Sequence, residues 1–403
     1  MNKARIVILG AGYAGMMAAL RLAGKDRNQR ADVTLINASD VFYERVRMHQ
    51  VATNQTSASH SIRKLLGKRP ITFIQGWVRA LDLERQVVQV DGQGEIGYDY
   101  LVYTLGSIPA QVKLPGVHEH LYAIGSPKQA AVLRERLIAL HPGSRVAVVG
   151  GGLTGIETAT EIAEAYPGLP VSLVTAGTPG QGLSQGGQAY LTRSFAEMGV
   201  TVYDHTRVAQ VEADALVTES GERIPFEVGI WAGSFEAAPL AREAGLAVNA
   251  KGQMRIDRYM RSISHPAVYG AGDGAAPVED PGAPLRMACA VALPMAAHTA
   301  DNLLARLEDR PQQPFNFGYV VQCVSLGRRR GLLQFVHPDD SPKERIVTGR
   351  MGAIAKEMIV QYAYRSLPAE RILPGAQVWL GKGQLPAGVE DAALPPDAKP
   401  VHS

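Results

Sequence analysis

The chain has 403 residues, enough for two or three domains of about 150 residues each. Its formal net charge is only +3, and charged side chains of both signs are interspersed, so we expect no nucleic-acid partner. The two cysteines, Cys289 and Cys323, lack the spacing of a metal site or a disulfide framework, which predicts no bound metal and fits a reducing, cytoplasmic setting.

The first predicted elements occupy residues 4–36, in the order strand, glycine turn, helix, strand. The apolar run begins at Ala4, too early for a signal peptide, and no stretch approaches about 18 uninterrupted apolar residues, so we expect no membrane span. The turn, Gly10-Ala-Gly12-Tyr-Ala-Gly15, matches the G-x-G-x-x-G pattern of dinucleotide-binding folds. Its glycines permit a tight turn, close approach of the backbone to a pyrophosphate, and close helix packing. The helix start adds partial positive charge.

The same order of elements returns at Arg145, where an apolar run leads into Gly150-Gly-Gly152-Leu-Thr-Gly155 and a second helical pattern. One such match in a glycine-rich chain can be an ordinary strand-to-helix turn. Two matches, each between a strand and a helix, predict two dinucleotide-binding domains in one polypeptide.

Both units lack the acidic residue that normally follows the fingerprint by about 20 positions and binds the adenosine ribose. The second strands end instead at Asn37 and Thr175, and the next cation after Thr175 is Arg193. The sequence shows neither a carboxylate that would repel a 2′-phosphate nor an arginine that would hold one. The choice between NADH and NADPH therefore stays open, with NADH slightly favoured.

The remaining segments predict how the domains are connected. Short strand-like pieces fill residues 71–90, apolar runs end at Gly106 and Gly233, and strand character resumes from Gly252 to Asp273. We expect an α/β fold in which the second domain is inserted into the first. The predicted limits are 1–111 with 251–314 for the first domain, 112–250 for the second, 315–367 for a smaller C-terminal α+β region, and 368–403 for a loosely packed, proline-containing tail.

With both fingerprints, the chain resembles flavoproteins that have two Rossmann-like dinucleotide-binding domains. Over residues 4–365 it is most similar to type II NADH:quinone oxidoreductases and apoptosis-inducing-factor-like proteins. Residues 98–107 and Trp231-Ala-Gly233 resemble the two crossovers of this family, and residues 254–273 resemble its segment with a flavin-binding aspartate. The resemblance implies that the first fingerprint binds FAD and the second binds NADH or NADPH.

The resemblance also implies individual site residues. It assigns cofactor contacts to Gly10, Gly12, Tyr13, Ala14, Gly15, Asn37, Arg45, Val78, Thr104, Gly106, Gly150, Gly152, Leu153, Thr154, Gly155, Gly233, Gly272, Asp273, Leu293 and Pro294. A helix is expected to begin at Pro294 and to direct its N-terminus at the flavin. Glu157 matches a glutamate near the flavin and nicotinamide rings and is the expected catalytic residue, although a first-turn glutamate also suits a helix N-terminus for structural reasons.

The segment Tyr43 to Arg47 lies where disulfide reductases of the superfamily carry redox cysteines, and it contains none. We therefore expect neither a flavin-disulfide relay nor a sulfide:quinone oxidoreductase. Further on, Arg328 to Arg330 is expected to be a solvated turn. One face of a later predicted helix is apolar and fits a core, a dimer contact or a membrane surface: Met351, Ile354, Ala355, Met358, Ile359 and Tyr362.

These observations predict an FAD-dependent oxidoreductase that takes hydride from NAD(P)H and passes electrons to a quinone or similar acceptor. It would be cytoplasmic or peripheral on the inner membrane surface, and the chain could form a homodimer. Two alternatives stay open: a soluble NAD(P)H reductase of a small iron-sulfur carrier, and a nucleotide-sensing flavoprotein with little turnover.

Overall fold

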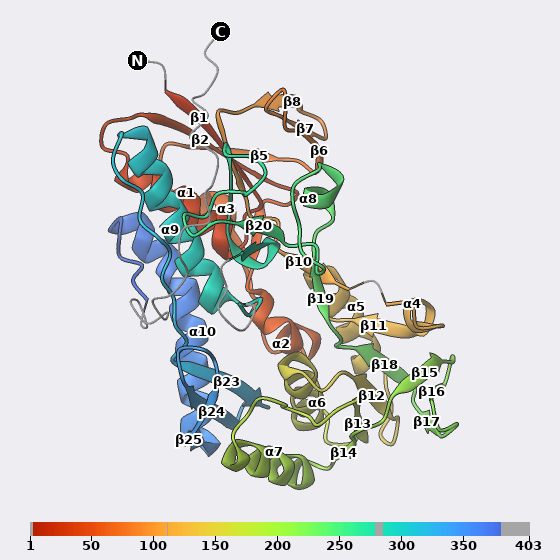
Figure 1. The fold of residues 1–403 in the computed structure, drawn as a ribbon. Coiled ribbons are helices and arrows are strands. Elements are labelled where there is room, and N and C mark those ends of the chain that lie inside the picture. The colour runs from red at the N-terminus through yellow and green to blue at the C-terminus, as the bar shows by residue number, and fades with distance from the viewer. Residues whose placement is uncertain (1–2, 111, 279–284, 380–403) are drawn as a thin grey trace.

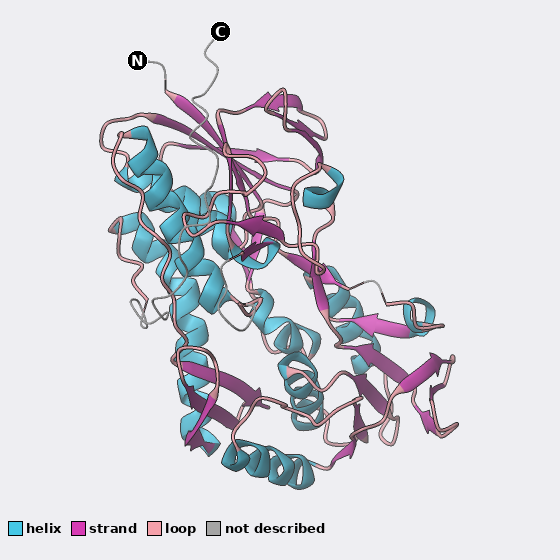
Figure 2. Cartoon of the chain, viewed as in Figure 1, coloured by secondary structure: helices cyan, strands magenta, loops and turns pink. Residues whose placement is uncertain are grey.

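The computed structural model describes residues 3–110, 112–278 and 285–379 (Figure 1). Two parallel sheets form separate α/β units, and a smaller antiparallel sheet with a long helix lies beside them (Figure 2). No helix in these described ranges is long and apolar enough to cross a membrane.

The first parallel sheet has the strand order β21-β9-β1-β2-β5. Its strands are β1 (Ala4–Leu9), β2 (Ala31–Asn37), β5 (Ile71–Gln75), β9 (Tyr100–Tyr103) and β21 (Val268–Gly270). Ile6 in the middle of β1 pairs with Val33 on one side and Tyr100 on the other. The strand β9 is buried throughout, as expected for a parallel sheet covered on both faces.

The second parallel sheet repeats this plan with the order β11-β18-β12-β13-β14. Its strands are β11 (Leu121–Ala123), β12 (Val146–Val149), β13 (Val171–Val174), β14 (Val200–Tyr203) and β18 (Val228–Trp231). In both sheets the strand that leads into a glycine loop lies between the next strand along the chain and a later closing strand. Loop and sheet therefore meet at a change of strand order, where α/β folds bind ligands.

Helices cover the parallel sheets. In the first unit α1 (Tyr13–Lys25) packs against α9 (Cys289–Leu307), and the second unit has α5 (Pro127–Ile138), α6 (Leu153–Ala165) and α7 (Gln185–Met198). Ser126 and Ser184 cap α5 and α7, because their hydroxyls accept hydrogen bonds from backbone N–H groups in the first turn. Both α1 and α6 instead begin after a glycine, which leaves their first N–H groups without a side-chain cap.

The C-terminal region is an antiparallel sheet of β23 (Val321–Leu326), β24 (Arg330–Val336) and β25 (Pro342–Thr348), followed by α10 (Gly349–Ile372). Two glycines let the helix lie directly on β24. A Cβ added to Gly352 would lie 2.2 Å from the Gly331 carbonyl oxygen, and one added to Gly331 would lie 2.6 Å from the Ala353 nitrogen. Larger side chains at either position would push the helix off the sheet.

Shorter elements complete the chain. Antiparallel pairing between β10 (Ser107–Pro109) and β19 (Phe235–Ala237) links the two connections between the parallel sheets. Two three-stranded antiparallel sheets are β6 (Val78–Asp82) with β7 (Val87–Val90) and β8 (Gly94–Gly97), and β15 (Val208–Val211) with β16 (Ala215–Thr218) and β17 (Arg223–Pro225). The others are β3 (Val41–Tyr43), η1 (Arg45–Arg47), α2 (Met48–Ala52), β4 (Ser59–Ser61), α3 (Ile62–Leu66), α4 (Val117–His120), α8 (Leu240–Glu243), β20 (Met254–Ile256), η2 (Gly272–Gly274) and β22 (Ala275–Pro277).

Two sequence expectations are wrong in detail, and one alternative is excluded. Helix α9 does not begin at Pro294 but at Cys289, because the apolar residues before the proline are buried and extend the helix by more than a turn. Packing does not end at Leu367, because α10 continues through Pro368 and the buried Gln377 donates its backbone N–H to Glu370. Most of the predicted tail, residues 380–403, lies outside the described residues. Of the three roles left open for the apolar face of α10, the exposure of Met351 and Met358, 64% and 66%, excludes a core face and leaves a dimer contact or a membrane surface.

Candidate active site

The first glycine loop is tightly packed at two positions and open at a third. Gly10 has φ +93, and a Cβ added there would lie 2.8 Å from the Thr104 carbonyl oxygen. A Cβ on Gly15 would lie 1.8 Å from the Gly10 oxygen, so α1 meets the loop closely. Nothing lies within 4 Å of a Cβ added to Gly12. The loop therefore presents an open backbone face at the start of α1, which is the geometry a pyrophosphate needs.

Polar side chains at the end of β2 and just after β9 hold this loop in place. Asn37 accepts a hydrogen bond from the Ala11 N–H through Oδ1, at 2.9 Å, and its Nδ2 donates to the Ser39 carbonyl. Thr104 donates its hydroxyl to the Leu9 carbonyl at 2.6 Å. Asn37 thus shapes the loop, which the sequence did not indicate, and it remains a predicted ribose ligand.

The predicted flavin residues of distant segments lie close to one another. Arg45 donates to the Ser107 carbonyl at 2.8 Å, and the Ser107 hydroxyl donates to the Asp273 carboxylate at 2.7 Å. A Cβ on Gly106 would lie 3.7 Å from the Arg45 guanidinium, and one on Gly272 would lie 3.0 Å from the Ala14 side chain. Burial raises the pKa of Asp273, although the Ser107 hydrogen bond and the Arg45 charge oppose it.

The remaining predicted flavin residues occupy less central positions. Tyr13 is buried at the start of α1, and its hydroxyl finds no hydrogen-bond partner among the described residues. Leu293 and Pro294 are buried within α9 rather than at its first turn. Val78 begins β6 and pairs with Val90 of β7.

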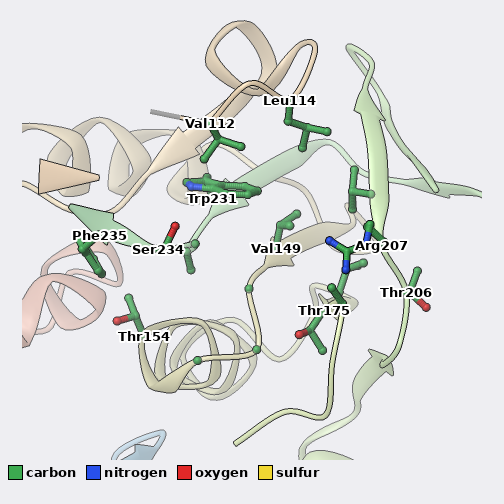
Figure 3. Close-up of a pocket in the computed structure, with 18 of the residues that line it drawn as sticks. Val112, Leu114, Val149, Thr154, Thr175, Thr206, Arg207, Trp231, Ser234 and Phe235 are labelled. Atoms are coloured by element: carbon green, nitrogen blue, oxygen red, sulfur yellow. The ribbon is translucent and has the colours of Figure 1, made fainter. Parts of the chain in front are cut away.

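The second loop borders a cavity of about 740 Å³ (Figure 3). Gly150 has φ +132 and packs against the Ala232 carbonyl, Gly155 packs against Gly150, and Gly152 is open like Gly12. The cavity is lined by Val112–Leu114, Val149–Thr154, Val174–Ala176, Thr206–Val208 and Trp231–Phe235. The predicted residues Gly150, Gly152, Leu153, Thr154 and Gly233 all lie on it. Arg207 also lines it, and the sequence did not single that residue out.

The expected catalytic carboxylate lies in a buried ion pair. Glu157 of α6 is 2.9 Å from the Lys356 ammonium of α10, and the two side chains are 9% and 12% exposed. The Ser325 backbone N–H and hydroxyl also donate to Glu157, at 3.0 and 3.2 Å. Burial by itself would raise the pKa of Glu157, but the charge of Lys356 and these hydrogen bonds bring it below its ordinary value. Glu157 is therefore ionised at neutral pH.

A histidine and a second carboxyl group extend this pair along α6. His49 of α2 lies 3.9 Å from Glu157 through Nδ1 and 3.9 Å from Glu161 through Nε2. Burial lowers the pKa of His49 to about 4 and raises that of Glu161 to about 7. His49 is therefore uncharged near neutral pH, whereas Glu161 is about half protonated there, beside an ionised Glu157. The sequence reasoning missed Lys356, His49 and Glu161, which come from three separate segments.

The cysteines form no disulfide. Cys289 at the start of α9 and Cys323 in β23 are both free thiols. Burial raises the pKa of both, that of Cys289 to about 11, so neither is a reactive thiolate at neutral pH.

Comparisons with known proteins agree with this geometry. A family model described as pyridine nucleotide-disulphide oxidoreductase matches residues 4–302. An NADH dehydrogenase-like protein of Mycobacterium tuberculosis is 27% identical over 349 residues, covering 80% of this chain and 86% of the relative. A type II NADH:quinone oxidoreductase of Haemophilus influenzae is 26% identical over 377 residues, covering 80% and 84%.

Two solved structures have the same fold. A sulfide:quinone oxidoreductase from Aquifex aeolicus has a TM-score of 0.78 at 21% identity and covers 93% of each chain. NDH2 of Plasmodium falciparum in complex with NADH has a TM-score of 0.77 at 15% identity and covers 93% of this chain and 99% of its own. The predicted family and the predicted fold class are confirmed, whereas the individual site residues remain predictions.

Proposed function

Because the chain belongs to the pyridine nucleotide-disulphide oxidoreductase family, we propose that it is an FAD-dependent oxidoreductase that takes hydride from NAD(P)H and passes the electrons to a quinone. One observation carries this proposal. The chain has two glycine loops of the same build, each closed at its first and third glycine and open at its second. Relatives named type II NADH:quinone oxidoreductase and demethylphylloquinone reductase support a quinone as acceptor.

The first loop and its neighbours fit FAD. Nothing lies within 4 Å of a Cβ added to Gly12, and the first N–H groups of α1 have no side-chain cap, which leaves both room and donors for an anion. Hydrogen bonds through Ser107 join Arg45 and Asp273, and Gly272, next to Asp273, packs against Ala14 of this loop. FAD, when bound there, supplies the redox chemistry. The chain supplies position and charge, so the reaction needs no protein nucleophile.

The second loop fits the mobile nicotinamide donor. Its cavity of about 740 Å³ is within the usual range for ligand sites, roughly 300–1,000 Å³. Helix α6 begins at this loop and carries Glu157 in its second turn. A carboxylate at this position belongs to the wall between donor and flavin in the proposed arrangement.

Glu157 is the residue we assign to proton handling. Reduction of a quinone by NAD(P)H consumes one proton from solvent in addition to the hydride, so a buried site needs a group that can hold a proton. Lys356 keeps the Glu157 carboxylate charged in the resting protein, and the neighbouring His49 and Glu161 are groups that can exchange protons with it. Lys356 is a positioning residue, since it acts through Glu157.

The exposed apolar face of α10 supports a membrane contact, as a lipid-soluble acceptor would require. Met351, Ile354, Met358 and Tyr362 are 64%, 45%, 66% and 52% exposed, and the exposed Arg350 and Arg365 lie on the same helix. An amphipathic helix with basic flanks suits an anionic lipid surface. We propose that this face rests on the membrane.

Anaerobic titration with NADH and with NADPH tests the redox proposal. We expect the visible flavin band of the purified protein to bleach, and menadione to reoxidise it faster than a ferredoxin does. A protein without flavin that also fails to take up FAD, or a flavin that neither donor reduces, would contradict the proposal. Preference for ferredoxin would assign the acceptor to the iron-sulfur class instead.

Vesicle co-sedimentation tests the membrane contact. Met358→Glu should lower binding to anionic vesicles several-fold, because it places a charge in the apolar face. Ile138→Glu is the matched control, since Ile138 is 57% exposed on α5, away from this face. If Met358→Glu binds vesicles as well as the wild type, the face does not contact lipid. The same holds if the variant keeps its vesicle binding but changes from a dimer to a monomer.

A further inference from the structure

The cavity beside the second glycine loop is cationic where β13 ends. Thr175 and Ala176 follow β13 there, and Thr206 and Arg207 approach from the connection before β15. Lys113 is the second cation on the cavity wall, and no Asp or Glu is among its described lining residues. The electrostatic field in the cavity therefore favours an anion.

Backbone hydrogen bonds fix Arg207 at this place. The Thr206 N–H donates to the Thr175 carbonyl at 2.8 Å, and the Glu219 N–H donates to the Arg207 carbonyl at 2.9 Å. Arg207 is thereby held between the end of β13 and the β15–β16 pair. Figure 3 shows its side chain extending into the cavity above Thr175. A rigid attachment matters because it leaves only the side chain to be ordered when a ligand binds.

The residue at the end of β13 determines whether an adenosine ribose with a 2′-hydroxyl or one with a 2′-phosphate binds better. A carboxylate at this position binds the ribose 2′-hydroxyl and repels a 2′-phosphate, whereas an arginine nearby accommodates the phosphate. Thr175 has no charge, and its hydroxyl lies against the glycine loop, 2.3 Å from where a Cβ on Gly151 would be. It can donate a hydrogen bond to a phosphate oxygen without opposing its charge.

The Arg207 guanidinium makes only a weak ion pair among the described residues. Its ion pair with Glu219 is 3.6 Å long, and the two side chains are 65% and 63% exposed. Such an exposed pair contributes little to stability, because water and salt screen the attraction between its charges. A phosphate dianion offers the guanidinium a bidentate, charge-assisted contact that is stronger.

We propose that Arg207, together with Thr175, binds the 2′-phosphate of NADPH and makes NADPH the preferred donor of this protein. This inference rests on the proposed function, whose donor it specifies. It reverses the slight preference for NADH drawn from the sequence, where Arg193 was the first cation considered after Thr175.

Ligand binding to the FAD-loaded protein tests the inference without turnover. Calorimetry would compare 2′,5′-ADP with 5′-AMP, which differ only in the 2′-phosphate. We expect 2′,5′-ADP to bind at least about tenfold more tightly, as for a hydrogen-bonded charge contact, and Arg207→Ala to bring the two affinities within about threefold. Arg207→Lys should recover part of the difference, because it keeps the charge but not the bidentate geometry.

Arg223→Ala is the control variant. Arg223 is also an exposed arginine of the β15–β17 sheet, but it is paired with Glu212 and Asp214 and does not line the cavity. It should leave the ratio of affinities unchanged. In turnover assays, the ratio of kcat/KM for NADPH to that for NADH should fall roughly 10- to 100-fold in Arg207→Ala.

The outcomes separate the two proposals. Equal binding of both nucleotides, or an equal loss in Arg207→Ala and Arg223→Ala, would overturn the role of Arg207 while flavin reduction by NADH still supported the oxidoreductase. Reduction by neither donor would overturn the proposed function. In that case a preference for 2′,5′-ADP that Arg207→Ala abolishes would still identify a 2′-phosphate site.

Discussion

Replacing Lys356 by methionine would isolate the buried charge of Glu157. Methionine keeps the length of the unbranched side chain but removes the ammonium, which lies 2.9 Å from the Glu157 carboxylate. Glu157 would keep its two hydrogen bonds from Ser325 and the contact with His49. None of these carries a full positive charge at neutral pH, since burial lowers the pKa of His49 to about 4.

The expected loss of unfolding free energy is about 3 kcal/mol. Removing one partner of a buried pair costs roughly 3–5 kcal/mol, and the Ser325 hydrogen bonds place this case at the lower end. In the wild type the pKa of Glu157 is lowered, so its stabilisation is present at neutral pH and is lost as the pH falls. Without Lys356 burial dominates and raises this pKa, so the variant should regain stability as the pH falls below neutral.

Urea unfolding of the FAD-loaded protein, followed by far-UV circular dichroism at neutral and mildly acidic pH, measures this effect. Arg79→Met is the control, because the side chains of the Arg79–Asp91 pair are 61% and 47% exposed and solvent screens their attraction, so its loss should change the free energy of unfolding much less. The double variant Lys356→Met with Glu157→Gln should recover much of the loss, since it leaves no unpaired charge. A loss no larger than the control's, or a double variant no more stable than Lys356→Met, would refute the argument.

Three further predictions concern Glu161 and the first glycine loop. Burial raises the pKa of Glu161 to about 7 from 4.5, so the wild type should lose about 3 kcal/mol of stability as the pH rises through this interval, and Glu161→Gln should flatten that slope in denaturation curves. Gly15→Ala should destabilise the apoprotein, because its Cβ would lie 1.8 Å from the Gly10 oxygen. Gly12→Ala should fold and melt normally as apoprotein, because its Cβ points into open space. It should nevertheless retain much less FAD per chain by absorbance, because that space is the proposed pyrophosphate site.

The sequence was informative where the relevant contacts are local. The fingerprints at Gly10 and Gly150 combine a strand, a turn and a helix start within a few residues, so their glycines can be interpreted without knowledge of the rest of the fold. The repetition of this unit led to the two-domain α/β class, which the comparisons confirm. The start of α9 was misplaced, because proline at a first helical position is a frequent but not obligatory arrangement.

The sequence was uninformative where partners come from distant segments. Lys356 is a lysine on an amphipathic helix, and only its position over β23 makes it the partner of Glu157. Arg207 lies in a polar connection after β14, and the register of the second sheet brings that connection to the end of β13. Its sequence distance from Thr175 gave no sign of this proximity. Searching for cations only directly after the second strand therefore missed it.

The C-terminal region contributes to the proposed active site rather than being an appendage. It supplies both Lys356 and Ser325 to Glu157, and its Glu357 pairs with Arg47 in the segment where the flavin is expected. A buried network of this kind is often no more stable than apolar residues of the same volume, so stability alone does not account for it. Its contact with the carboxylate proposed for proton handling accounts for it better, because the charge of Glu157 depends on α10 staying docked. Any movement of α10, for example on contact with a membrane, would therefore change the protonation of the one carboxylate assigned to catalysis.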